Sequence, residues 1–543
     1  MTPRPAPILP LLGLLTAGCW SGSYNKEDAD KQVYAILEQA AEGVVGQRKV
    51  FTVERPVDTL RRRLSDSPVP VKLSLLDAID VAAENSREFQ RAKESLYLSA
   101  LNLTRTQWDF SVQFGVGGSA EVNGTGDDTA NVALRDDLAA SVNSTAGTRV
   151  FTSFANSFLR SVVNGGAFDG SSILSLGLTQ PIMRGAGTSI AREPLTQSER
   201  NVVYQVRDFE RFRATFAVQV VSSYYQVVRQ MADLKSVEAS YRSFVQNREL
   251  TQEYFDAGRK TITDLGRALQ SEYSAEADLV ASKNALATAL DRFKVLLGIP
   301  TTAQVELDGT ELDRLVASGV TPVELDSTTA VQIALARRYD HRNIVDEVED
   351  AGRRVMVSED ALNIILDFSG ALSVPAEDGN GLNLDWSKVN WSAGFDLDLA
   401  LDKLPERNAY RSSLIQLDVA IRTREQSEDE IASEIRSALR DIQSAYDSYR
   451  IQLEAVRLAE QRVEATLDLY AAGRVQAIER LDAQDALLSA QLALSRAIVQ
   501  YSIARIELLR DLEGLALEPR GLRYDPALPL PALPTPPATQ EKP

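Results

Sequence analysis

Few residues of this sequence could do catalytic or metal chemistry. Its 543 residues include one cysteine, Cys19, and one histidine, His341. A zinc site of several histidines and a cysteine cluster are therefore excluded, and no spare imidazole remains for a conventional triad. The sequence also has no GxxxxGK(S/T) phosphate loop, no GxSxG nucleophile turn and no strand-led GxGxxG. We expect a protein that is not an enzyme and uses no cofactor or metal, with His341 as a surface residue.

The charge balance argues against binding to nucleic acid. Lys and Arg total 58 against 76 Asp and Glu, which gives a formal net charge of −18. Proteins that bind nucleic acid need a basic face to neutralise phosphates. Apolar residues make up 44% and charged residues 25% of the chain, a mixture typical of folded proteins.

The one cysteine follows a stretch with the pattern of a secretory signal. A positive charge at Arg4 and a short apolar stretch precede Ala17, Gly18 and Cys19, which is the layout of a secretory signal. The small residues before the cysteine resemble a bacterial lipoprotein processing site. That resemblance implies removal of residues 1–18 and acylation of Cys19, with palmitate among the acyl chains. Residue 20 is Trp rather than the Asp that retains lipoproteins at the inner membrane, so delivery to the outer membrane is allowed.

Long helices are the main elements that would position any site. Between residues 435 and 512, apolar residues recur every seven positions, which predicts helices that pack as coiled coils. One row consists of alanines alone, and it allows two helix backbones to approach closely: Ala483, Ala490, Ala497 and Ala504. The helix predicted for residues 405–470 has about 65 residues and a length of about 100 Å, which exceeds an ordinary globular domain.

The helical pattern occurs twice. Residues 220–297 align without a gap with residues 435–512, at an offset of 215 residues. In this alignment Ala257-Gly258-Arg259 matches Ala472-Gly473-Arg474. Each half reads as helix, strand, strand and helix. The chain then divides into a signal peptide (1–18), an N-terminal segment (19–72), a first repeat (73–298), a connector (299–325), a second repeat (326–514) and a Pro-rich tail (515–543), which we expect to be flexible from Pro519.

Four segments alternate between apolar and polar residues and predict strands: 110–116, 174–179, 364–374 and 389–401. Such alternation fits a barrel strand with lipid on one side and water on the other. Trp108, Trp386 and Trp391 lie in or beside these strands, as tryptophans do at membrane interfaces. Four strands cannot close a membrane barrel, so several chains must contribute. The Gly, Ser and Asn-rich residues 117–170 are interpreted as enlarged external loops or an extended first hairpin.

These features together resemble the TolC-like outer-membrane efflux proteins, of the lipoprotein type. The stretches that carry the resemblance are Leu176–Gly185, Leu404–Arg411 and the hairpin turn Ala257–Leu265, together with the two repeats over about residues 70–515. The resemblance implies a mainly α protein with membrane β structure, a homotrimer in outer-membrane lipid. Each chain would give four strands to a 12-stranded barrel and two coiled-coil hairpins to an α-helical barrel.

The resemblance also implies a function and its site residues. The chain would be the outer-membrane exit duct of a tripartite efflux or type I secretion system, with a periplasmic adaptor and an inner-membrane transporter as partners. The residues placed at the adaptor-binding tips are Gly258, Arg259, Asp264, Leu265, Gly473, Arg474 and Glu479. Asp256 and Asp468 would form carboxylate rings at a gate, or remain solvated outward charges. The alternative is a lipid-anchored periplasmic scaffold or adaptor, which explains the heptads and Cys19 but not the alternating strands.

Overall fold

The computed structural model describes residues 22–525 except 47, 49–50, 57, 67–69, 126–128, 162–168, 319, 377–382, 400, 473 and 519–520. The predicted signal peptide and Cys19 lie outside the described residues. The chain forms two compact units. Unit 1 comprises Met1–Phe51, Ser95–Val206 and Asn343–Glu425, and unit 2 comprises Thr52–Glu94, Arg207–Arg342 and Gln426–Pro543. Four helices have residues in both units: α5 (Arg87–Asp109), α7 (Glu193–Asp256), α11 (Tyr339–Asp360) and α12 (Leu404–Ala471).

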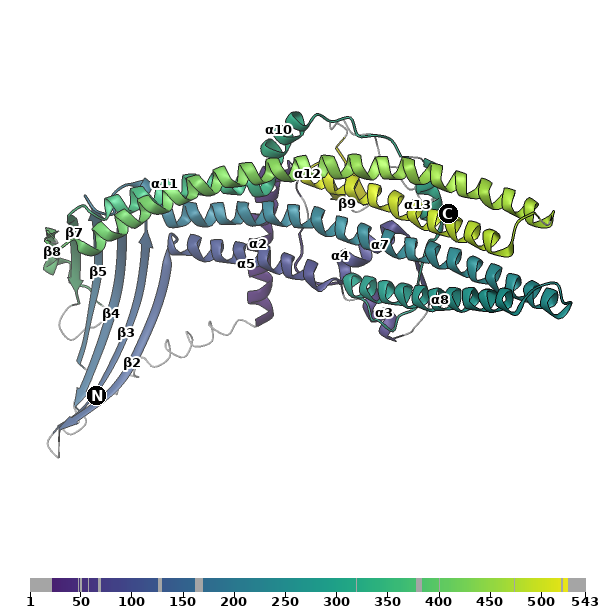
Figure 1. Ribbon diagram of the computed structural model, residues 1–543. Coiled ribbons are helices and arrows are strands. Elements are labelled where there is room, and N and C mark those ends of the chain that lie inside the picture. The colour runs from purple at the N-terminus through teal and green to yellow at the C-terminus, as the bar shows by residue number, and fades with distance from the viewer. Residues whose placement is uncertain are drawn as a thin grey trace, which may run out of the picture. The chain divides into compact units, whose positions relative to one another are not determined.

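Unit 1 is built around one six-stranded sheet in which every neighbouring pair is antiparallel (Figure 1). In spatial order the strands are β2 (Gln113–Thr125), β3 (Thr129–Asn143), β4 (Arg149–Ser161), β5 (Asp169–Pro181), β7 (Ile365–Pro375) and β8 (Asn390–Asp398). Four of them, β2, β5, β7 and β8, overlap the predicted segments. The expectation of four strands per chain is wrong, because the Gly, Ser and Asn-rich stretch extends β2 and supplies β3 and β4. Many apolar positions there are alanines, so the alternation in sequence is weak.

Helices meet the sheet at one end. β2 follows α5, β5 leads through α6 (Thr188–Ala191) to α7, β7 follows α11 (Tyr339–Asp360), and β8 leads to α12. The N-terminal helix α2 (Gly22–Val45) matches the helix expected near residues 26–45. It packs through Tyr34, whose ring lies 6.1 Å from those of Phe51 and Tyr97, while the Tyr97 hydroxyl donates to Asp30 at 2.6 Å.

Unit 2 contains the two predicted hairpins. α7 turns into α8 (Ile262–Leu297), and α12 turns into α13 (Ala477–Asp511). The first helices end at 256 and 471, and the second begin at 262 and 477, so the 215-residue repeat holds at both boundaries. None of the described helices combines the length and the apolar character needed to cross a bilayer.

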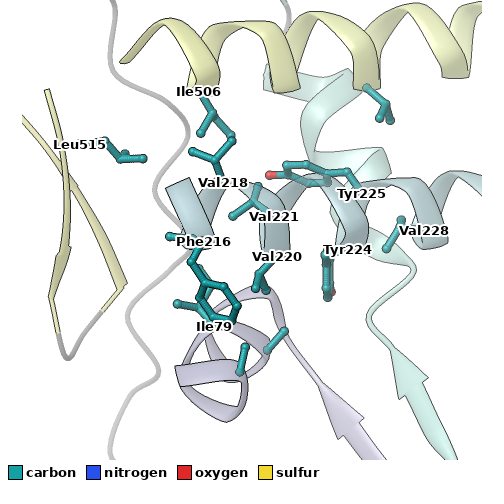
Figure 2. Packing of buried hydrophobic residues seen from close by; sticks show 14 of the residues in the cluster. Ile79, Phe216, Val218, Val220, Val221, Tyr224, Tyr225, Val228, Ile506 and Leu515 are labelled. Atoms are coloured by element: carbon teal, nitrogen blue, oxygen red, sulfur yellow. The ribbon is translucent and has the colours of Figure 1, made fainter. Parts of the chain in front are cut away.

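The core of unit 2 lies where both hairpins meet shorter elements. Phe216, Val220 and Tyr224 of α7 pack against Ile79 of α4 (Leu75–Asn85), while Ile506 of α13 lies beside Val218 (Figure 2). Around this core lie α3 (Leu60–Asp66), β1 (Val71–Leu73), β6 (Val305–Leu307), α9 (Thr310–Ser318), α10 (Ser327–Arg337), β9 (Leu515–Glu518) and β10 (Gly521–Tyr524). β1 and β6 pair in parallel, and β9 and β10 pair antiparallel.

Two local expectations are corrected in unit 2. Within the predicted connector 299–325, β6 and α9 bury Leu307, Leu312 and Leu315 in the core. The first described part of the predicted flexible tail is structured, because β10 pairs with β9, and residues 526–543 lie outside the described residues. His341 is not a surface residue: it is 6% exposed, and its Nε2 lies 4.0 Å from a Glu428 carboxylate oxygen.

The helix expected from Leu73 to Thr106 is broken at Ser86, which has ψ 133°. The end of α8 occupies the space beside the break. A Cβ on Gly298 would lie 2.2 Å from the Asn85 carbonyl oxygen, and the φ of +72° at Gly298 also favours glycine. Arg61 links the ends of α4 and α8. Its backbone N–H donates to the Asn85 side chain, and its guanidinium donates to the Gly298 carbonyl.

Candidate functional sites: the two-faced sheet and the hairpin tips

One face of the sheet is apolar. Residues paired across the sheet share a face, so the register assigns every described side chain to one side. The large apolar residues of this face include Phe114, Val116, Leu134, Leu138, Phe154, Leu174, Leu176, Leu372, Trp391, Phe395 and Leu397. Phe114 and Trp391 are 78% and 76% exposed in the single chain. So large an exposed apolar surface is typical of a face that meets lipid or another protein.

The opposite face is more polar and is acidic. Serines, glycines, threonines and asparagines are frequent on it, although Phe151, Leu159 and Ile173 also lie there. Its described charged residues are the carboxylates Glu121, Asp137, Asp367, Asp396 and Asp398 and the arginines Arg135 and Arg149. The Ser369 hydroxyl donates to Asp396 at 2.9 Å, and Asp137 lies over Gly117, where a Cβ would be 2.3 Å from its Oδ1. This face can line water and favours cations.

One cross-strand row interrupts the apolar face with polar groups. Asp136, Asn156 and Ser172 are neighbours in this row. The Asn156 amide donates to Asp136 Oδ2 at 2.7 Å, and both Asn156 and Ser172 are buried. Polar groups within a membrane are tolerated where they pair with one another, so this row is compatible with a lipid-facing sheet.

The lengths of the strands and the tryptophans at their two ends are those expected of strands that cross a membrane. The strands hold between 9 and 15 residues, and a tilted transmembrane strand needs about 9–11. Trp108 precedes β2 at the helical end of the sheet. Trp386 lies in the 3-10 turn Trp386–Lys388, and Trp391 lies near the start of β8, both at the opposite end. All three side chains are exposed, as in the aromatic belts at the two interfaces of a bilayer.

The strand-to-helix turns of the two repeats meet at the helical end. Arg184 of the first turn and Glu406 of the second approach within 3.6 Å. The Gly185 N–H donates to Asp360 at 2.7 Å, and the Lys403 ammonium donates to the Leu362 carbonyl at 2.6 Å. These contacts join the two stretches on which the sequence resemblance rests and fix where the sheet ends.

A buried carboxylate joins α7 to α11 in unit 1. Asp350 is 1% exposed on its side chain and lies 2.6 Å from the Arg200 guanidinium. It also accepts hydrogen bonds from Arg353 at 2.8 Å, Tyr204 at 2.7 Å and Gln197 at 2.9 Å. Burial alone would raise the pKa of Asp350, but these donors and the Arg200 charge hold it below its ordinary value. Sequence patterns did not predict this network, because the members on α7 and those on α11 lie about 150 residues apart.

The first hairpin tip is tightly capped. Gly258 adopts a φ of +72°, and the Arg259 N–H donates back to the Tyr254 carbonyl at 2.8 Å, which closes α7. Thr261 begins α8 with a capping box in which its side chain and that of Asp264 satisfy each other's backbone N–H. The hydrogen bonds from Thr261 lower the pKa of Asp264. Leu265 is 6% exposed and packs inside the hairpin.

The second tip has weaker capping. The Arg474 N–H donates to the Leu469 carbonyl at 2.8 Å, as at the first tip, but Gln476 begins α13 without a side-chain cap. The Glu479 N–H donates to the Gln476 carbonyl at 3.1 Å. Gly473 lies outside the described residues. The Arg480 guanidinium lies 5.4 Å from the Tyr470 ring centre.

The charged residues predicted at the tips are available to a partner. Those that are exposed are Arg259, Arg474, Glu479, Asp256 and Asp468. Asp256 accepts a hydrogen bond from Gln252 at 2.9 Å within α7. The two hairpins contact each other behind the tips through Phe244, Ala275 and Leu481. Adaptor contact and the carboxylate rings at these residues stay predictions.

A surface pocket of about 460 Å³ lies in unit 2 between the two hairpins and α10. Two ion pairs lie in its lining, Arg338 with Glu434 at 2.7 Å and Arg510 with Asp511 at 2.9 Å. Among the described residues, no three His, Cys, Asp or Glu side chains are placed to hold a metal ion. The Arg338–Glu434 pair joins the end of α10 to α12.

The fold is that of outer membrane channels. The chain is similar to the CmeC outer membrane channel of Campylobacter jejuni (TM-score 0.60, 15% identity, 81% of this chain and 85% of that chain). It is also similar to the outer membrane protein VceC of Vibrio cholerae (0.58, 16%, 81% and 95%) and the MtrE outer membrane channel of Neisseria gonorrhoeae (0.57, 13%, 81% and 88%). No curated protein sequence matches the chain.

Residues 330–512 match the family model described as outer membrane efflux protein. This range contains the second predicted repeat almost entire, including β7, β8 and the hairpin of α12 and α13. The second predicted repeat is therefore similar to the outer membrane efflux proteins, and the resemblance seen in the sequence is confirmed.

Proposed function

We propose that the chain is the outer-membrane exit duct of a tripartite efflux or type I secretion system. Three copies form the conducting trimer, with their sheets in the outer membrane and the hairpin tips of unit 2 against a periplasmic adaptor. An inner-membrane transporter supplies the substrate and the energy. The duct itself conducts passively, and Cys19 carries the acyl chains that add a second anchor.

The observation that carries this proposal is the two-faced sheet on a scaffold of paired coiled-coil hairpins. The apolar face needs lipid and the acidic face needs water, and a wall between lipid and an aqueous pore provides both. A periplasmic scaffold without a channel, the second candidate, would leave Phe114, Trp391 and their neighbours exposed to water. The match of residues 330–512 to the outer membrane efflux family model supports the duct over the scaffold.

Photo-crosslinking in the native bacterium tests the adaptor contact. A crosslinking amino acid replaces Arg259 or Arg474 at the two tips, and a matched control replaces Arg422, an exposed arginine of α12 in unit 1. We expect the tip positions to capture a periplasmic adaptor and the control to capture none. Deletion of the gene should also raise the accumulation of a panel of dyes and drugs, restored by the wild-type chain. Capture from Arg422 alone, or accumulation unchanged by deletion, contradicts the proposal.

A further inference from the structure

Both outer strands of the six-stranded sheet have an open edge. β2 and β8 each pair on one side only within the described part of the chain. All nine residues of β8 are exposed. Unpaired backbone N–H and C=O groups are costly in lipid, so a membrane sheet has to close on itself. A single chain of six strands is too small to close, because about eight strands are needed.

A second copy of the same chain fits these edges. The sheet has an even number of antiparallel strands, so β2 and β8 run in opposite directions. β2 of one copy can therefore continue the antiparallel order beside β8 of the next. The apolar residues Val116 and Trp391 would then remain on one side of the wall, and the polar residues Ser119 and Ser392 on the other.

We propose that three copies join β8 to the next copy's β2 and close an 18-stranded barrel. The inference rests on the trimer of the proposed function and changes its membrane part, because the family resemblance implied 12 strands. Three sheets of six strands give 18. Since barrel diameter grows roughly linearly with strand number, the opening is about 1.5 times as wide as that of a 12-stranded barrel. The outer opening then places little restriction on the size of the substrate.

The two strands that exceed the four expected per chain, β3 and β4, are part of the barrel wall. β3 and β4 lie between β2 and β5, and the register pairs them over 13 residues with each other. Side chains fill the seams on both sides of this hairpin: the Phe151 ring of β4 covers Gly177 of β5, and the Asp137 carboxylate of β3 lies over Gly117 of β2. Leaving this hairpin out of the barrel would separate β2 from β5 and break both seams.

Cysteine crosslinking between copies in outer-membrane vesicles tests the proposal. Ser392→Cys on β8 is combined in one chain with a cysteine on the same polar face of β2, at Gln113, Gly115 or Ser119. The matched controls combine Ser392→Cys with Ser153→Cys, Ala155→Cys or Ser157→Cys on β4, which lies inside the sheet. Three positions are scanned on each strand because the register between copies sets which one comes within disulfide distance.

We expect at least one β2 combination to yield covalent trimers on non-reducing gels and the β4 combinations to yield only monomers. Crosslinks from β8 to β4 would mean that four strands enter the barrel and overturn the proposal. Covalent dimers as the largest product would mean 12 strands from two copies and also overturn it. Absence of crosslinks from every combination overturns the pairing of β8 with β2. The crosslinking pattern is read without any transport assay, so this test is separate from that of the proposed function. Trimers crosslinked through β4 would overturn the 18-stranded barrel and leave the proposed exit duct unaffected.

Discussion

Asp350 shows how much a single buried charge contributes to the architecture of unit 1. Four donors from α7 and α11 converge on its carboxylate, and α7 and α11 each connect directly to a strand of the sheet or to its turn. Removing one partner of a buried pair leaves the others unsatisfied, which costs more than the pair contributes when intact. The packing of α7 against α11 therefore depends on the Asp350 side chain.

Asp350→Asn should lower the free energy of unfolding by about 3 kcal/mol, because Arg200 and Arg353 lose their buried counter-charge. The native pKa of Asp350 is depressed. Its stabilisation is therefore fully present above the unfolded carboxyl value of about 3.9 and is lost as the pH falls through the native pKa. Thermal unfolding of the detergent-solubilised protein between pH 7 and pH 3 measures both effects.

Glu349→Gln is the control for that experiment. Glu349 also lies near Arg200, at 3.4 Å, but its side chain is mostly exposed. An exposed pair of this kind contributes about 0–1 kcal/mol, so this variant should unfold close to the wild type. If Asp350→Asn unfolds like Glu349→Gln at neutral pH, the buried network does not hold α7 to α11.

At the scale of elements, the helices were more predictable than the strands. The heptads and the Ala-Gly-Arg turns located both hairpins to within a residue, because each apolar position repeats many times along one helix. β5 and β8 alternate large and small side chains and were also found. β3 and β4 were missed, because alanine stands at positions such as 133, 139, 140 and 155 on both faces and gives little contrast.

The site residues on helices were likewise easier to predict from the sequence than those on strands. Exposed tip residues such as Arg259 and Arg474 were identified from the turn motif. The carboxylates Glu121 and Asp137 of the polar face were missed with the strands that carry them, since a residue's side of the wall is known only when its strand and register are known. The Asp350 network was missed because it joins segments distant in sequence.

The acidic face predicts the ion preference of the pore. Its described residues hold five carboxylates against two arginines, so cations should be concentrated near the wall. Reversal potentials of single channels across a KCl gradient should show preference for K⁺, and Asp367→Asn with Asp396→Asn should reduce it. These two residues are paired across β7 and β8. Glu349→Gln, outside the sheet, should leave the preference unchanged, and an anion preference in the wild type would contradict the assignment of this face to the pore.

At the scale of the whole molecule, the proposed duct would be attached to the membrane by two independent features. One is the acylation proposed at Cys19, and the other is the apolar face of the sheet. Their strengths differ, because one or two acyl chains anchor a protein reversibly, whereas a closed barrel is part of the bilayer. The difference separates a duct from a lipid-anchored scaffold, since only the duct needs the second attachment.

Residues 20–543 exported behind a signal peptide without the lipoprotein site should therefore remain in the membrane. We expect this chain to resist extraction by carbonate, to need detergent for release, and to run as an oligomer that dissociates on heating. The control carries the native residues 1–19 and should behave in the same way apart from its acyl chains. Release of the non-acylated chain into buffer as a folded monomer would contradict the barrel, because Phe114, Leu138 and Trp391 would then be stable in contact with water.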